Sequence, residues 1–145
     1  MIGMQNRQAA GLLMGRILLG LIFVVSGIGK IGKFATVAGF MSAKGMPMSE
    51  LLLVATIALE ILGGLAIILG WKARWAAAAI FLFLIPTTLI FHPFWNADPA
   101  SYQNQLNHFL KNLAIMGGML YLVLLGAGRF SVDHGDARTR AVIAD

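Results

Sequence analysis

Cysteine is absent from the 145-residue chain. The protein therefore cannot form a disulfide, a dithiol relay, a thiolate-bound zinc site or a cysteine-ligated iron–sulfur cluster. The sequence also lacks a phosphate-binding loop, a dinucleotide fingerprint and the spacing of a metal cluster. If redox chemistry takes place here, we expect the electrons to come from another subunit.

Charge is scarce as well. Charged residues make up 12% of the chain, hydrophobic residues 59%, and the mean hydropathy is +0.81. A soluble domain carries about 25% charged residues and roughly 45–50% apolar ones. A chain with so little polar surface cannot cover itself in water. The composition therefore predicts an integral membrane protein.

Four apolar runs are present, and each is close to the roughly 20 residues that a membrane-spanning helix needs. The sequence predicts an all-α, integral membrane four-helix bundle that forms one domain over residues 1–133. A polar cytoplasmic tail follows at residues 134–145, and residues 1–10 are expected to be frayed. The expected spans cover about residues 11–29, 50–69, 75–91 and 106–125.

The segment between the first two spans is too polar to cross a bilayer. Within it, Phe34, Val37, Phe40 and Met41 recur at helical spacing. This pattern predicts a short amphipathic helix at the membrane interface. Ser49 is then expected to cap the start of the second span.

The net charge of +5 comes from basic residues that stand singly or in pairs at the ends of the apolar runs. Such positions are typical of orientation signals and phospholipid contacts, so we do not expect nucleic-acid binding. Four spans place both termini on one side, and the larger group of basic residues predicts that this side is the cytoplasm. The two groups are Arg7, Arg16, Lys72, Arg74, Arg129, Arg138 and Arg140 on the side of the termini, and Lys30, Lys33, Lys44 and Lys111 on the other.

Glu60 lies near the middle of the second apolar run. An ionisable side chain at that depth costs about 3 kcal/mol or more and is expected to face protein or trapped water. Arg16 and Lys111 each lie about one or two turns inside a boundary, and either side chain is long enough to reach towards Glu60. The pattern leaves two interpretations open, a structural ion pair and a working acid.

Polar side chains follow one face at the start of the fourth span. His108, Lys111 and Asn112 lie there, and His92 ends the antiparallel third span at a similar height. We therefore expect a polar pocket floored by Glu60. Its candidate catalytic residues are Glu60, Lys111 and His92, its candidate cofactor-binding residues are Arg16, His108 and Asn112, and no metal ligands are expected.

Each candidate also has a plainer interpretation. Arg16 and Lys111 are long enough to extend to the phospholipid headgroups. The two histidines are compatible with interfacial caps, or with axial ligands of a b-type haem. Lys30 fits an anchor at the membrane interface.

The order and spacing of these positions resemble the DoxX family of small four-helix membrane proteins. The resemblance covers about residues 16–133. It rests on Arg16-x10-Gly27-x2-Lys30, Lys44-Gly45-x-Pro47, Glu60-x2-Gly63-Gly64-x5-Gly70, His92, Phe109-x-Lys111-Asn112-x4-Gly117-Gly118 and Gly128-x2-Ser131-x-Asp133.

The resemblance implies a bacterial inner-membrane protein. Family members include a subunit of a thiosulfate:quinone oxidoreductase and a partner in oxidant-defence complexes. Carried over by position, the polar residues of the family would be Arg16, Lys30, Glu60, His92, Lys111 and Asn112.

Our leading hypothesis is a redox-associated subunit that handles quinone, or a similar amphipathic small molecule, together with a redox partner subunit. Lys111, His92 or His108 would donate hydrogen bonds to a carbonyl oxygen, and Glu60 would accept or relay a proton. The alternative is a non-catalytic assembly or lipid-binding protein whose buried charges are structural. A small transporter is a weaker third reading, and a homo-oligomer is compatible with all of them.

Overall fold

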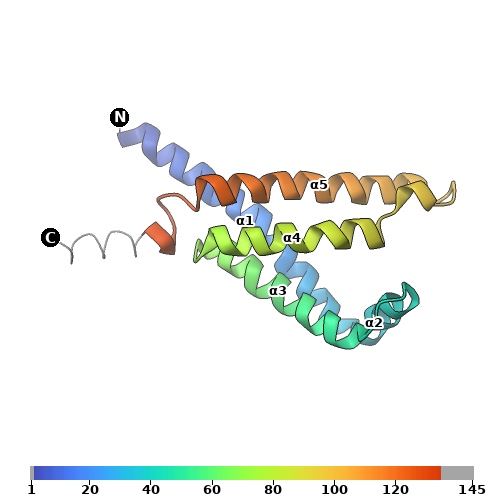
Figure 1. Cartoon of the computed structure of the whole chain (residues 1–145). Helices are drawn as coiled ribbons and strands as arrows, with labels where there is room; N and C mark the ends of the chain where they lie inside the picture. The colour runs from blue at the N-terminus through green and yellow to red at the C-terminus, as the bar shows by residue number, and fades with distance from the viewer. Residues whose placement is uncertain (1, 135–145) are drawn as a thin grey trace.

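The computed structural model describes residues 2–134 of the chain, and the rest of the predicted tail lies outside this range. The described residues form helices and no strands (Figure 1). The elements are α1 (Ile2–Gly32), α2 (Phe34–Ala43), α3 (Ser49–Leu69), α4 (Ala73–Phe91), a 3-10 turn (Phe94–Asn96) and α5 (Tyr102–Leu125).

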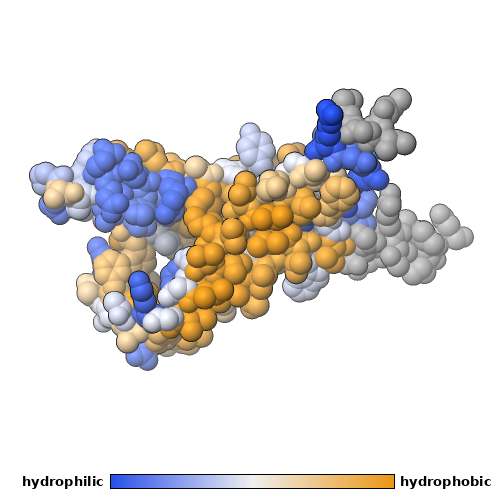
Figure 2. All heavy atoms as spheres, turned by 180° about the vertical axis from the view of Figure 1, so that it is seen from behind, coloured by the Kyte–Doolittle hydropathy of each residue, from blue (hydrophilic) through white to orange (hydrophobic). Residues whose placement is uncertain are grey.

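Four of these helices are long and apolar enough to cross a bilayer. They are α1 from Gln5, α3, α4 and α5, while the ten-residue α2 lies between the first two. The prediction of an all-α four-helix membrane protein with a short helix between spans 1 and 2 is confirmed. Large apolar side chains cover the outside of the bundle, which appears as a broad orange surface in Figure 2.

Three local predictions were wrong. The first residues are helical from Ile2 onward rather than frayed. Ser49 makes no capping hydrogen bond, and the residue before α3 is Met48 in a left-handed conformation. The last long helix begins at Tyr102, one turn earlier than expected.

Asp98 explains the early start of α5. Its carboxylate accepts hydrogen bonds from the N–H groups of Ala100 at 2.9 Å and Ser101 at 3.0 Å. Its carbonyl oxygen accepts the N–H of Tyr102 at 2.9 Å. Hydrogen bonds from the hydroxyl and the N–H of Ser101 hold the pKa of Asp98 below its ordinary value. The first turn of α5 is therefore organised by a residue outside the apolar run, where hydrophobic periodicity gives no signal.

The helices form two antiparallel pairs. One pair is α1 with α3, and the other is α4 with α5 (Figure 1). The pairs are joined mainly through α3 and α4, which a tight turn at residues 70–72 connects. We call the end of the bundle with this turn, the first turns of α1 and residues 126–134 the terminal end. The opposite end, which carries α2 and the 3-10 turn, is the loop end.

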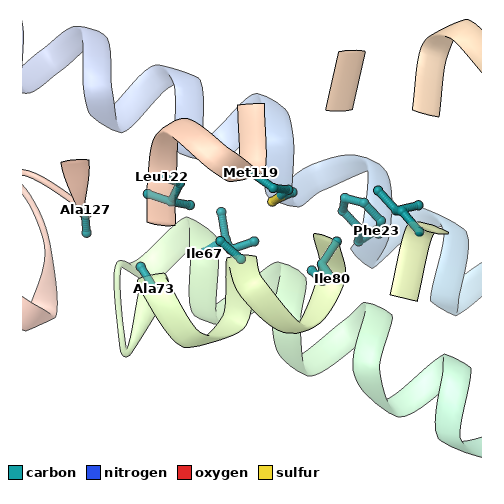
Figure 3. Packing of buried hydrophobic residues seen from close by; sticks show 9 residues of the cluster. Phe23, Ile67, Ala73, Ile80, Met119, Leu122 and Ala127 are labelled. Atoms are coloured by element: carbon teal, nitrogen blue, oxygen red, sulfur yellow. The ribbon is translucent and has the colours of Figure 1, made fainter. Parts of the chain in front are cut away.

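The main apolar core fills the space between the two pairs. Its fully buried side chains include Ile67, Ile80 and Met119, with Phe23 of α1 at its edge (Figure 3). A smaller cluster around Leu53 holds α2 against α3. The pairs diverge towards the loop end, so the main core does not extend through the whole bundle (Figure 1).

Glycines set the close approach of α1 to α3. A β-carbon at Gly64 would lie 2.8 Å from the carbonyl oxygen of Gly20 and 2.9 Å from Val24. A β-carbon at Gly27 would lie 2.6 Å from Ile61. Residues 63–64 are therefore used for close packing.

Gly11 and Gly15, four residues apart on α1, form a similar face that is not covered by another helix. A β-carbon at either glycine would meet nothing within 4 Å. Helix α5 lies beside this part of α1, but the two helices make few contacts. The spacing of the two glycines in the sequence therefore marks a face of small side chains, but it does not show whether another helix packs against that face.

The segment after α5 folds back over the terminal end. The carboxylate of Asp133 accepts the N–H groups of Lys72 at 2.7 Å and Ala73 at 3.1 Å, and its own N–H donates to the carbonyl of Gly70 at 3.0 Å. Arg16 of α1 donates to the carbonyl of Phe130. Residues 126–134 therefore form a clasp that caps α4 and connects it to α1.

The hydrogen bonds of the clasp predict how strongly two substitutions at Asp133 lower the stability of the protein. Asp133→Ala removes the cap of α4 and is expected to destabilise the protein by about 1 kcal/mol. Asp133→Asn keeps one oxygen that can accept one of the two N–H groups and is expected to cost less. Thermal unfolding in detergent checks both variants, and equal stability of the alanine variant and the wild type would contradict the capping role.

The glycine crossing predicts a contrast between two glycines on different helices. Gly64→Ala places a methyl group against the α1 backbone, so we expect a clear drop in the melting temperature. Gly11→Ala meets open space and gains helix propensity of about 1 kcal/mol, so it is expected to be neutral or stabilising. Equal shifts of the melting temperature in the two variants would show that Gly64 is not specifically needed for the close approach of α1 to α3.

Candidate functional site

A buried ion pair lies between α1 and α3 towards the loop end. Glu60 is 5% exposed, and both of its carboxylate oxygens accept hydrogen bonds from Lys30 Nζ, at 2.8 and 2.9 Å. Lys30 also donates to Ser26 Oγ at 2.6 Å, and the Ser26 hydroxyl donates to Glu60 at 3.3 Å. The pair is the only ion pair among residues 2–134.

The partner of Glu60 differs from the expected one. Arg16 and Lys111 were the predicted partners, and Lys30 was interpreted as an interface anchor. The structure pairs Glu60 with Lys30 because Gly27 brings α1 against α3 one turn away. Ser26 and Lys30 are four residues apart and share the helix face that looks onto Glu60.

A polar cavity of about 180 Å³ adjoins the ion pair. All four long helices contribute to its wall, so it lies inside the bundle. The cavity lies where the sequence placed a polar pocket, and it is lined by the Lys30–Glu60 pair rather than by a lone acid. Its polar lining residues are Ser26, Lys30, Glu60, Thr87, His92, Lys111 and Asn112.

A second, largely apolar cavity of about 260 Å³ shares part of this wall. Lys30, Glu60 and His92 line both spaces, so the ion pair lies where they meet. Helix α2 closes one side of the apolar space with Val37, Phe40 and Met41. Figure 2 shows the surface hollowed between the two arms of the loop end.

A third hollow, of about 250 Å³, lies between α3 and α4. It shares Thr56, Phe83 and Thr87 with the apolar cavity, and its outer rim includes the exposed side chains of Leu52 and Ile90. These rim residues belong to the apolar outer surface of two spanning helices. The apolar cavity is therefore adjacent to the side of the bundle that faces lipid.

Two histidines stack at the mouth of the polar cavity. The rings of His92 and His108 have centroids 5.0 Å apart and are inclined by 20°. His92 Nδ1 lies 3.0 Å from Oε1 of Gln105, within hydrogen-bond distance. Lys111 donates to His108 Nδ1 at 3.1 Å. The two rings thus contact each other directly.

Asn112 joins the fourth span to the third. Its amide donates to Thr88 Oγ1 at 3.0 Å, and both side chains are buried. Thr87 instead donates to the carbonyl of Phe83 at 2.8 Å, one turn back along the helix that Pro86 interrupts. The polar groups of this wall are thus largely satisfied within the protein.

The structure brings together four of the six predicted site residues. Glu60, His92, Lys111 and Asn112 line the polar cavity, and His108 stacks behind His92 without lining it. Arg16 lies at the terminal end, bonded to Phe130, and is not part of this site.

Sequence reasoning assigned Lys30 to the interface and did not select Ser26 or Thr87. The i, i+4 spacing of Ser26 and Lys30 on the first span was the available signal, because it aligns a hydroxyl with an ammonium group.

Comparison with known proteins agrees with this architecture. Residues 11–93 match the family described as DoxX. Inner membrane protein YqjF of Escherichia coli is 38% identical over 131 residues, which cover 90% of this chain and 95% of that protein. Inner membrane protein YphA of the same species is 30% identical over 123 residues, or 85% and 88% of the two chains.

A more distant similarity reaches eukaryotes. The Surfeit locus protein 4 homolog of Schizosaccharomyces pombe is 30% identical over 131 residues, which cover 89% of this chain but only 38% of that protein. No solved structure matches the chain.

The ion pair predicts non-additive effects of substitution. Lys30→Met alone leaves the buried carboxylate of Glu60 without its partner and is expected to cost about 3–5 kcal/mol. Glu60→Met leaves the partly exposed ammonium group of Lys30 unpaired and is expected to cost less. The double variant buries no charge and is expected to be more stable than either single variant. Thermal unfolding in detergent measures the stability of all three variants. If the loss of stability in the double variant equals the sum of the two single losses, the residues are not coupled.

Proposed function

The chain belongs to the DoxX family, and we propose that it is an inner-membrane protein that binds a quinone, or a similar amphipathic small molecule, around the Lys30–Glu60 pair. The observation that supports this proposal is the meeting of a polar and an apolar cavity at a buried ion pair. Ligand sites are mostly apolar and contain a few convergent polar groups. The inner-membrane location is supported by the names of the two Escherichia coli relatives.

The two cavities suit the two parts of such a molecule. The head would occupy the polar cavity, where Lys111 can donate to a carbonyl oxygen and Nε2 of a neutral His92 can accept from a hydroxyl. The apolar tail would lie against Phe40, Met41 and Leu53. The hollow between α3 and α4 would admit the molecule from the bilayer without passage through water.

The ion pair would give the site its proton chemistry. Glu60 is close to Lys30 and Ser26, so a proton that arrives at its carboxylate weakens the bonds from both groups and changes the charge of the pocket. In this proposal Glu60 accepts or relays a proton, and a partner subunit supplies or removes the electrons.

Quinone retention tests the proposal. The full chain, purified in detergent and incubated with a short-chain quinone, is separated from free ligand, and the bound quinone is extracted and quantified. Glu60→Gln and Lys111→Ala are each expected to reduce retention about tenfold, since a hydrogen bond to a charged group contributes about 1.5–3 kcal/mol. Glu50→Gln is the matched control, because Glu50 is an exposed acid on the same helix.

The outcomes separate a ligand-binding role of these residues from a purely structural one. Retention that is unchanged in both site variants removes the proposed roles. A loss in Glu50→Gln of the same size would mean that the effect is not specific to the cavity.

A structural role for the ion pair is the second candidate function. The three ammonium hydrogens of Lys30 find acceptors in Ser26 and Glu60, so the group is satisfied without a ligand. If the protein is an assembly or lipid-binding protein and the ion pair is structural, Glu60→Gln is expected to lower the melting temperature. Quinone retention and the results of redox assays should then stay unchanged.

We also propose that the terminal end faces the cytoplasm. Exposed basic residues gather there, including Lys72, Arg74 and Arg129. The absence of native cysteine makes single-cysteine labelling clean. In intact cells, Asn96→Cys is expected to react with a membrane-impermeant maleimide and Lys72→Cys only after lysis. The reverse pattern would invert the topology.

A further inference from the structure

A groove of about 190 Å³ lies between α1 and α5 at the terminal end, away from the ion pair. Its walls are almost entirely apolar and include Leu19, Tyr121 and Leu125. Gly11 and Gly15 line it on the α1 side and have no neighbour within 4 Å of a β-carbon position. The two helices make few contacts, so the groove is not filled by the described residues.

The one charged side chain in the wall of this groove is Arg16. It is 3% exposed, and it donates from Nη2 to the carbonyl of Phe130, while Nε and Nη1 have no hydrogen-bond partner among the described residues. Asp133 lies on the same clasp but directs its two carboxylate oxygens to the backbone of α4. The guanidinium group thus forms no ion pair within residues 2–134.

A buried charge with unpaired donors is costly, because each donor has lost its hydrogen bond to water without gaining another. An anionic oxygen from outside the chain would offset this cost. Arg16 lies beside the turn that ends α3, at Gly70, and the groove also reaches Gly126, where α5 has just ended. This level corresponds to the end of the spanning helices, which is where lipid headgroups begin.

Further cations surround the groove. Arg74 packs against Gly126, with Nε 3.0 Å from a β-carbon position, and Arg129 donates to Gln5 of α1 at 3.5 Å. The first turns of α1 project past the end of α5 and carry Arg7 (Figure 1). Arginine is suited to phosphate because its planar fork donates two parallel hydrogen bonds.

We propose that this groove holds an anionic phospholipid, with one acyl chain along the glycine face of α1 and the phosphate within reach of Arg16, Arg74 and Arg129. An acyl chain fills an apolar groove of this kind, and a phosphodiester supplies the missing anionic acceptor. A lipid fits better than a free anion because the groove is apolar and lies along two spanning helices. This site is separate from the proposed quinone cavity and does not depend on it.

Thermal unfolding of the full chain in detergent tests the site with phosphatidylglycerol, phosphatidylcholine or soluble glycerol phosphate. We expect phosphatidylglycerol to raise the melting temperature more than the other two. Gly15→Leu fills the groove and is expected to abolish the difference between the two lipids. Gly29→Leu is the matched control on the same helix, because it also meets open space but does not line the groove.

A second measurement does not depend on stability. Native mass spectrometry should show wild type and Gly29→Leu with bound phosphatidylglycerol, and Gly15→Leu with about tenfold less or none. Arg74→Gln with Arg129→Gln should lower retention by about tenfold while leaving the clasp intact.

Four results would overturn the proposal. Equal effects of the two lipids on the wild type would remove the anion preference, and an equal effect of glycerol phosphate would indicate a free-anion site. Unchanged lipid binding in Gly15→Leu would place the lipid elsewhere. Conversion of a dimer to a monomer by Gly15→Leu, with lipid binding unchanged, would identify the groove as an interface between two copies.

Discussion

The Lys30–Glu60 ion pair is the constraint on which the rest of the bundle depends. A carboxylate at this depth is tolerated only where a cation and further donors reach it, and both come from α1. They reach it because Gly20, Gly27 and Gly64 let the two backbones approach closely. The position of α1 on α3 is thus fixed by close packing at the glycines and, one turn away, by the ion pair. The cavities exist beside this pair because the second helix pair diverges from it.

The spans, the short α2 helix and the use of residues 63–64 for close packing could be predicted from the sequence, because each depends on local apolar periodicity or on small side chains. Four residues of the polar cavity were also predictable. In the sequence, Glu60 lies at mid-span, His92 ends the third span, and Lys111 and Asn112 lie in the polar stripe at the start of the fourth. The partner of Glu60 was not predictable, because the register and rotation of α1 against α3 are set by three-dimensional packing.

Arg16 shows a second limit of sequence reasoning. Its depth in the first span suggested a partner within the membrane, but the structure bonds it to Phe130, in a segment 114 residues later. Asp133 could not be assigned either, because a polar residue after the last span resembles ordinary tail sequence. The positions that resemble the DoxX pattern therefore divide into two groups. Lys30, Glu60 and Lys111 line the cavity, while Asp133 belongs to the clasp and Arg16 of α1 binds to it.

The clasp also has a consequence for the order in which the protein matures. The N–H groups at the start of α4 receive their acceptor from a residue about sixty positions later, with separations of 60 and 61 residues. During synthesis α4 emerges long before Asp133 does, so its first turn must rely on water or headgroups until the last span has been inserted. The complete helix end is therefore a late event in synthesis, because it forms only once the acid that caps it is in place.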